Sequence, residues 1–296
     1  MSKTMLLQTF RPSFLILSVV CVFLGFSTAF SAEASINNST ALLILIGAIS
    51  AHISVNTLNE YADYKSGLDF LTIKTAFSGG SGALPAQPTM AGAVLISGLV
   101  ALTITIAIGI FFIHEHGIHI LPIGLTGILL IIGYTPWLNR SPLLCLFSPG
   151  LGFGILMVIG THTLLSSSPT PLPWLISLIP FFLNNNLLLL NQYPDMNADQ
   201  SIGRRTFPIV YGTHKSNLIY ACFTLFAYSF VLILIIEGAL PMLSVIALAP
   251  LALSLYALMG AWKHSAKIGQ YPQYLAANVA AAILTPLLLG ISILVG

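Results

Sequence analysis

Long apolar runs, separated by short polar segments, make up most of the chain. A transmembrane helix needs about 20 predominantly apolar residues, and nine runs of that order are present. The predicted spans are 12–31, 41–62, 90–112, 117–136, 145–165, 172–194, 215–236, 240–262 and 273–295. Turn-forming residues mark the connections, among them Pro85 and Pro88, and Gly238 with Pro241. The pattern predicts an all-α polytopic membrane protein with nine transmembrane helices.

The first run could also be a secretory signal, because Lys3 and Arg11 precede it and Ser-Ala-Glu-Ala follows it. Eight further runs follow, which favours a retained first helix. No linker or change in composition divides the chain, so we expect residues 1–296 to form a single transmembrane domain.

Composition agrees with a membrane location. Only 6% of the residues are charged and 56% are hydrophobic, whereas a soluble domain carries about 25% charged residues. The net charge of +2 provides no basic surface for nucleic acid, so no nucleic-acid partner is predicted.

The basic residues give the expected orientation. Every Lys and Arg falls at the N-terminus or in a connection on the same side of the predicted membrane. They are Lys3, Arg11, Lys65, Lys74, Arg140, Arg204, Arg205, Lys215, Lys263 and Lys267. The positive-inside rule then places the N-terminus and these loops in the cytoplasm.

Five of the eight acids form two groups on that same side. The first group comprises Glu60, Asp63 and Asp69, and the second comprises Asp195 and Asp199. A spacing of four keeps side chains on one helix face.

That spacing aligns Asn59 with Asp63 at the end of the second span. It also aligns Asn191 with Asp195 and Asp199, provided that Pro194 only kinks the sixth span. The pair Asn191 and Asp195 repeats the pair Asn59 and Asp63 with the same displacement of 132 residues, which suggests an internal duplication.

Facing carboxylates at a membrane boundary need a compensating charge. Ligands that are oxygen only, without His or Cys, favour Mg²⁺, which usually binds a few carboxylates together with substrate phosphate. Nearby bases could hold the remaining phosphate oxygens; they are Lys65, Lys74, Arg140, Arg204 and Arg205. For any single acid, pairing with an adjacent base at the interface is the simpler interpretation.

Two motifs carry a family resemblance. The first is Asn-Glu-Tyr-Ala-Asp-Tyr-Lys-Ser-Gly-Leu-Asp at 59–69, followed by the glycine-rich residues 79–82. The second is Asp195-xxx-Asp199-xxx-Gly203-Arg204-Arg205-Thr206. Together they resemble the UbiA superfamily of intramembrane prenyltransferases, most closely the branch that prenylates 1,4-dihydroxy-2-naphthoate on the way to menaquinone.

The resemblance implies a helical bundle with a central cavity under a cytoplasmic cap, in a bacterial or archaeal plasma membrane. It implies transfer of a polyprenyl group from an allylic diphosphate to a small aromatic acceptor, with Mg²⁺ as cofactor. The implied metal-site residues are Asn59, Asp63, Asn191, Asp195 and Asp199. The predicted catalytic acids are Asp63, Asp69, Asp195 and Asp199. Tyr134 and Arg140 resemble the family's Tyr and basic residue after the fourth helix, and would bind the diphosphate.

Two departures leave the acceptor open. Glu60 stands where an Asp is commoner, and Phe153 stands where the menaquinone branch often has Glu. Another quinone precursor, a tetrapyrrole or a lipid is therefore an alternative acceptor. An ion-coupled transporter is disfavoured, because carriers place their acids near the bilayer midplane.

Polar residues within the spans have two interpretations. Asn184 shares a helix face with Asn191 and Asp195 and could line a cavity, although interhelical hydrogen bonding explains it equally well. His52 and His162 are interpreted as structural. Asp69 and Glu60 are the candidates for the base that removes the acceptor's proton.

Overall fold

The computed structural model describes residues 3–32, 36–166 and 170–296, and every regular element within these ranges is helical. Eight helical stretches are long and apolar enough to cross a membrane. They are α2 (Pro12–Ala32), α3 (Asn38–Ser66), Pro88–His116 with α5 (Ala91–His116), Pro142–Leu165, α9 (Leu172–Asn191), α11 (Phe207–Ile236), Met242–Gln270 with α12 (Leu251–His264), and α13 (Pro272–Val295). This confirms an all-helical protein with many membrane-spanning helices.

The fourth predicted span is shorter than expected. It consists of the 3₁₀ turn η3 (Ile118–Ile120) and α6 (Leu121–Gly133), which hold 3 and 13 residues. The helix ends at Gly133, three residues before Pro136, which cannot continue a helix. Nine full-length spans are therefore not confirmed, because this one is a shorter apolar helix.

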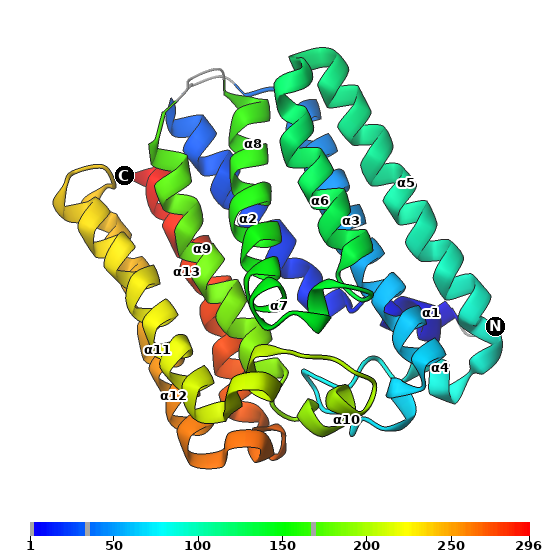
Figure 1. Ribbon diagram of the computed structural model, residues 1–296. Helices are drawn as coiled ribbons and strands as arrows, with labels where there is room; N and C mark the ends of the chain where they lie inside the picture. Colours follow the sequence, from blue (N-terminus) through cyan, green and yellow to red (C-terminus); the bar gives the residue numbers. More distant parts are fainter. Residues whose placement is uncertain (1–2, 33–35, 167–169) are drawn as a thin grey trace.

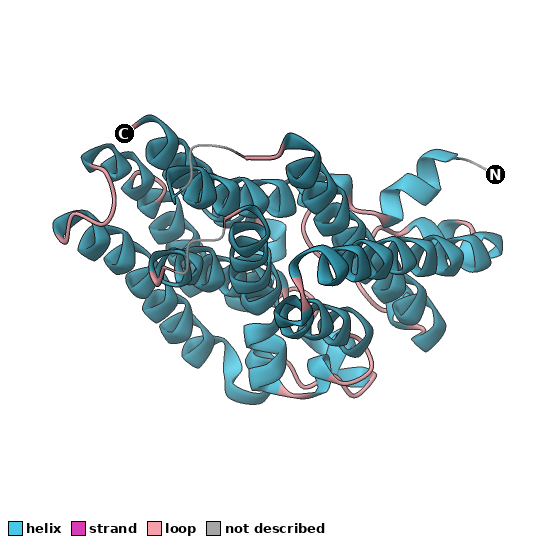
Figure 2. Cartoon of the chain, turned by 90° about the horizontal axis from the view of Figure 1, so that it is seen from above, coloured by secondary structure: helices cyan, strands magenta, loops and turns pink. Residues whose placement is uncertain are grey.

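Neighbouring helices pack as long pairs. α3 lies along α5, α9 along α11, and α2 along α13, and Figure 2 shows the helices almost end-on. A large core lies between α2, α9, α11 and α13, with Leu24, Ile179, Val231 and Leu289 fully or almost fully buried. This core fixes α9, which carries Asn191 and leads into the second acidic group.

Short elements gather at one end of the bundle, and the C-terminus lies at the other end (Figure 1). They include α1 (Lys3–Thr9), α4 (Ala83–Ala86) and α10 (Met196–Ser201). Both acidic groups belong to this end, because α3 and α9 deliver them there in their last turns or just beyond.

The two helices that lead to the acidic groups end differently. α3 ends at Ser66, and the next residue, Gly67, has a left-handed φ of 81° and donates its N–H to the Tyr64 carbonyl, which caps the helix. α9 ends at Asn191, and a turn through Pro194 leads to Asp195, the residue before α10. Asn191, Asp195 and Asp199 thus do not lie on one kinked helix. The proline ends the helix instead of bending it.

The stretch Pro142–Leu165 is not a regular α-helix. It runs through α7 (Pro142–Pro149), the π-helical turn η5 (Gly150–Leu156) and α8 (Met157–Leu165). Gly154 lies so close to α9 that a Cβ there would be 2.4 Å from the Phe181 nitrogen. The Asn185 amide oxygen accepts the Gly150 N–H at 2.7 Å. π turns often occur at functional sites, and this one presents Phe153 to a cavity.

Candidate active site

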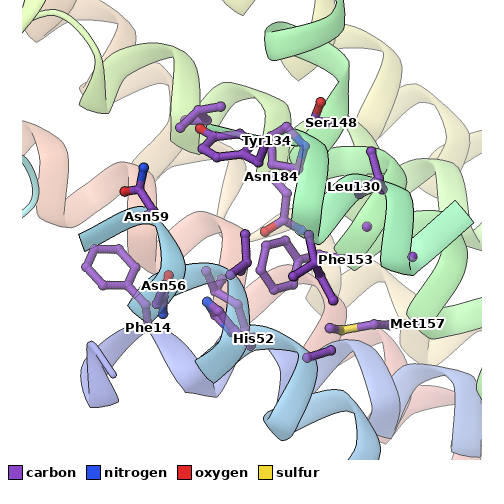
Figure 3. Close-up of a pocket in the computed structure, with 18 of the residues that line it drawn as sticks. Phe14, His52, Asn56, Asn59, Leu130, Tyr134, Ser148, Phe153, Met157 and Asn184 are labelled. Carbon is purple, nitrogen blue, oxygen red and sulfur yellow. The ribbon is translucent and has the colours of Figure 1, made fainter. Parts of the chain in front are cut away.

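A cavity of about 430 Å³ lies inside the bundle. At one end it reaches Asp63, Asp195 and Asp199, and farther along it reaches Ile44 and Phe112. Figure 3 shows Asn59 and Tyr134 in one part of the cavity, with His52, Phe153 and Met157 farther along it. The chamber is thus polar and acidic at one end and largely apolar beyond.

Most of the predicted site residues line this cavity. They are Asn59, Asp63, Asp69, Tyr134, Asn191, Asp195, Asp199 and Arg204. Four predicted diphosphate ligands do not line it and have exposed side chains: Lys65, Lys74, Arg140 and Arg205. Lys74 instead donates to the Ser81 carbonyl in the glycine-rich loop.

Arg204 joins the two acidic groups. Its guanidinium donates to Asp63 on α3, and at 2.8 Å to Asp199 on α10. The two carboxylates come from segments 136 residues apart and share this one cation. The opposite charges raise the pKa of Arg204 despite its burial, which acts to lower it.

Glu60 forms a second charge centre, with a partner that sequence reasoning missed. Arg11 donates to it from two nitrogens, at 3.1 and 2.8 Å, and the Ser81 N–H and hydroxyl donate at 2.7 and 2.8 Å. Glu60 is 1% exposed and fully paired, so it has no free oxygen to act as a base. The only sequence signal for Arg11 was its position directly before an apolar run.

The glycine-rich loop 79–82 forms hydrogen bonds to both acidic groups. Gly79 donates its N–H to Asp195 at 3.0 Å, and Ser81 binds Glu60. Gly79, Gly80 and Gly82 all have positive φ, which favours glycine. A Cβ on Gly80 would lie 3.0 Å from an Asp69 oxygen. The loop therefore holds the acids in place.

Unpaired oxygens mark where a cation fits. Among the predicted site residues, three buried oxygens have no hydrogen-bond partner within the described part of the chain: Asp69 Oδ2, Asn191 Oδ1 and Asp195 Oδ1. Buried polar atoms are normally paired, and oxygen donors of this kind suit a hard divalent cation. The described part of the chain contains no group of three or more His, Cys, Asp or Glu side chains arranged to hold a metal ion. Two of the carboxylates, Asp63 and Asp199, are paired with Arg204 instead.

The protonation of these acids reflects their burial. Burial, with the neighbouring charges of Glu60 and Asp63, raises the pKa of Asp69 to about 7. Burial and the charge of Asp199 raise the pKa of Asp195 to about 7, although the Gly79 N–H opposes this. Both acids are thus poised to lose a proton when a cation arrives.

Comparison with known proteins decides the family. The model of the UbiA prenyltransferase family matches residues 18–273, which is most of the chain. The chain belongs to the UbiA prenyltransferase family. The family predicted from the sequence is confirmed, and the chain is a prenyltransferase, an integral multi-pass membrane enzyme.

One relative of this UbiA-family protein is a 1,4-dihydroxy-2-naphthoate octaprenyltransferase of Bacillus subtilis (strain 168). It is 30% identical over 241 residues, which cover 78% of this chain and 74% of the relative.

Solved UbiA homologues share the fold. The apo structure from Aeropyrum pernix K1 gives a TM-score of 0.72 at 15% identity, over 92% of this chain and 94% of that one. The Archaeoglobus fulgidus homologue bound to DMAPP and Mg²⁺ gives 0.63 at 13% identity, over 95% and 98% of the two chains. At such identities the likeness shows the fold alone.

Proposed function

We propose that this UbiA-family enzyme transfers a polyprenyl group from an allylic diphosphate to an aromatic acceptor in menaquinone or related quinone biosynthesis. The observation that carries the proposal is the meeting of both acidic groups at one end of a cavity whose remainder is largely apolar. A polyprenyl diphosphate likewise has a charged end and a long apolar chain, so its two parts match the two parts of the cavity. The whole chain serves as one catalytic domain.

We assign the metal site to Asn59, Asp63, Asn191, Asp195 and Asp199, with Asp69 beside them. The three unpaired oxygens support this assignment. Mg²⁺ held there would act as a Lewis acid on the departing diphosphate. Homologues of the fold have been solved with Mg²⁺ and with the allylic diphosphates DMAPP and GPP.

Arg204 is the main protein cation for the diphosphate. It is the only one of the five predicted diphosphate-binding bases that lines the cavity, where it lies beside Asp63 and Asp199, and a cation placed there can stabilise developing negative charge. Arg11, held by Glu60, lines the same cavity. The exposed bases Lys65, Lys74, Arg140 and Arg205 would steer an anion toward the opening.

The apolar part of the cavity keeps water from the allylic cation that forms when the diphosphate departs. Tyr134, which lines the acidic end, is the candidate aromatic side chain to stabilise that cation. Asp69 has an unpaired oxygen and no basic partner among the described residues. It is therefore the better candidate for the base that accepts the acceptor's proton.

The acceptor proposal rests on the naphthoate-prenylating relative from Bacillus subtilis. The orientation rests on the basic residues, which place the acidic end in the cytoplasm of a bacterial or archaeal plasma membrane.

The test is a transfer assay with detergent-purified protein, labelled geranylgeranyl diphosphate and a panel of acceptors. The panel contains 1,4-dihydroxy-2-naphthoate, another quinone precursor, a tetrapyrrole and a glycerol ether lipid. We expect a prenylated naphthoate product that disappears in EDTA and returns with MgCl₂. If only another acceptor gave a product, the proposed acceptor would be wrong and the enzyme would belong to a different pathway. If no acceptor gave a product, the proposal would be refuted.

A further inference from the structure

A second set of polar side chains lies at one depth within the apolar part of the cavity, and we call it the second polar level. His52 and Asn56 reach it from α3, and Asn184 reaches it from α9. Phe14, Phe153 and Met157 surround these residues (Figure 3). The donor's prenyl chain can pass this level, but an apolar chain needs no polar partner there. Polar side chains in a membrane interior are costly unless they are paired, and those that face a cavity often mark a substrate site.

The residues of this level are placed on α3 and α9 in the same way as the asparagines at the acidic end of the cavity. His52 precedes Asn59 by seven residues, and Asn184 precedes Asn191 by seven. At 1.5 Å per residue, both side chains lie about 10 Å deeper in the bundle than the two asparagines. His52 and Asn184 also differ by 132 residues, as Asn59 and Asn191 do. The two halves of the chain therefore direct a polar group into the cavity at the same depth.

Asn184 has an unsatisfied acceptor at this level. The residue is 1% exposed, and its amide nitrogen donates to the Pro180 carbonyl at 2.8 Å. Its Oδ1 is buried and has no hydrogen-bond partner within the described residues. A buried amide oxygen without a partner is expensive, and a donor supplied by a bound ligand would satisfy it.

His52 is held so that one ring nitrogen remains available. Its Nδ1 shares a hydrogen bond of 2.9 Å with the Ser18 hydroxyl, and Ser18 does not line the cavity. The Phe153 ring packs edge-on against the imidazole, with ring centroids 4.7 Å apart. Ser18 and Phe153 thus fix the ring, and Nε2 is left for a ligand. Phe153 also offers an aromatic surface for stacking.

The side chains of the second polar level favour an uncharged ligand group. His52, Asn56 and Asn184 carry no formal charge, and the Arg11 and Arg204 guanidiniums are engaged by Glu60, Asp63 and Asp199 at the other level. A carboxylate buried here would have no unpaired cation to bind, which is strongly unfavourable. A hydroxyl can donate to Asn184 and pair with His52 at no such cost.

We propose that His52 and Asn184 bind a phenolic hydroxyl of the acceptor that points away from the diphosphate, with Ser18 as a positioning residue. The inference rests on the proposed prenyl transfer, which requires an aromatic acceptor beside the donor. It adds the residues that hold the acceptor and the requirement that its deeper substituent be a hydroxyl and not a carboxylate.

The test is equilibrium binding of three small probes to the purified full-length protein, by calorimetry without donor or metal. The probes are 2-naphthol, 2-methoxynaphthalene and 2-naphthoate. We expect wild type to bind 2-naphthol at least about tenfold tighter than the other two, because only the hydroxyl can donate to Asn184. In Asn184→Leu and His52→Phe this preference should fall to about threefold or less, and Ser18→Ala should lose part of it.

Asn186→Leu is the matched control. Asn186 lies on the same helix but does not line the cavity, and its amide nitrogen binds the Tyr220 carbonyl and the Thr224 hydroxyl. This variant should lower the melting temperature and keep the probe preference. Equal preference in wild type and Asn184→Leu, or naphthoate bound as tightly as naphthol, would overturn the inference. Because the assay involves no transfer, these results are distinct from failure of the proposed function.

Discussion

Arg204 is the residue that links the two acidic groups of the site by ion pairs. It is the shared partner of Asp63 and Asp199, and its side chain is 14% exposed. Its neighbour Arg205 is exposed and lies outside the cavity lining. Sequence spacing gave these two arginines the same expected role, and only the three-dimensional placement separates them.

Arg204→Gln should therefore lower prenyl transfer by about 10²–10³-fold, as loss of one buried donor to a developing negative charge does. It should also destabilise the protein by about 3–5 kcal/mol, because two buried carboxylates lose their partner. Transfer kinetics and thermal unfolding in detergent would measure both effects. Arg205→Gln, the control, should stay within about threefold of wild type. Equal losses in the two variants would contradict the assignment.

Asp69 and Asp195 make stability depend on pH. Burial raises the pKa of both to about 7, above the value near 3.9 expected for Asp in an unfolded chain. Their contribution to stability is thus fully present below about pH 4 and is lost as the pH rises through 7. In EDTA, the melting temperature should fall between pH 5 and pH 8.

MgCl₂ with inorganic diphosphate should reverse this trend, because cation binding needs the deprotonated acids and is favoured as the pH rises. Thermal unfolding at a series of pH values would measure both slopes. Asp195→Asn should reduce the slope in EDTA and weaken the effect of MgCl₂. An unchanged slope in that variant would show that Asp195 does not titrate in this range.

Glu60 shows the limit of sequence reasoning for single residues. Its position in the first acidic motif made it a candidate base. The structure instead pairs both of its oxygens with Arg11 and Ser81, from segments on either side of it in sequence. Spacing along a helix predicts which side chains share a face, but it does not predict partners that come from separate segments.

Among the elements, the glycine-rich loop 79–82 offers the sharpest experiment. Gly80 and Gly67 both have left-handed φ, at 71° and 81°. Alanine at either position carries the same backbone penalty of about 1–2 kcal/mol. Only at Gly80 would the new methyl press on Asp69, at 3.0 Å, while nothing lies within 4 Å of a Cβ on Gly67.

Gly80→Ala should therefore raise the Mg²⁺ concentration needed for half-maximal transfer, because it displaces an acid beside the proposed metal site. Gly67→Ala should lose a similar amount of stability and keep its Mg²⁺ requirement. Metal titration of transfer together with thermal unfolding separates the two effects. The same shift in both variants would mean that backbone strain, and not the Asp69 contact, is responsible.

Element types followed from the sequence, whereas some element ends did not. Apolar length predicted the long helices because burial in lipid requires it. Proline effects were harder to predict: Pro194 follows the end of α9, while Pro180 and Pro286 lie inside α9 and α13. The π turn at Gly150–Leu156 was not foreseen, since it depends on close packing of Gly154 against Phe181.

At the scale of the whole molecule, the cavity follows the length of the bundle. Its lining includes Asp63 near the end of α3 and Ile44 near the beginning, nineteen residues earlier. At 1.5 Å per residue this corresponds to about 28 Å, enough for several isoprene units. Donor chain length should then be limited by the far end of the cavity, close to the start of α6.

Gly124 on α6 tests this limit. It lines the cavity ten residues from Tyr134, about 15 Å along the helix axis, and nothing lies within 4 Å of a Cβ placed on it. Gly124→Leu should fill the channel without disturbing its neighbours. We expect kcat/KM to stay within about twofold for geranyl diphosphate and to fall about tenfold or more for geranylgeranyl diphosphate and longer donors.

Gly92→Leu controls for the substitution itself, since Gly92 lies on α5 with equal space around its Cβ but outside the cavity lining. It should leave the preference among donors unchanged. A uniform loss for all donors in Gly124→Leu would indicate a damaged fold, and an unchanged ratio would mean that the prenyl chain leaves the cavity before it reaches α6. A loss that grows with chain length fits only a chain lying along this channel, because Gly124 is too far from the acidic groups to affect the diphosphate directly.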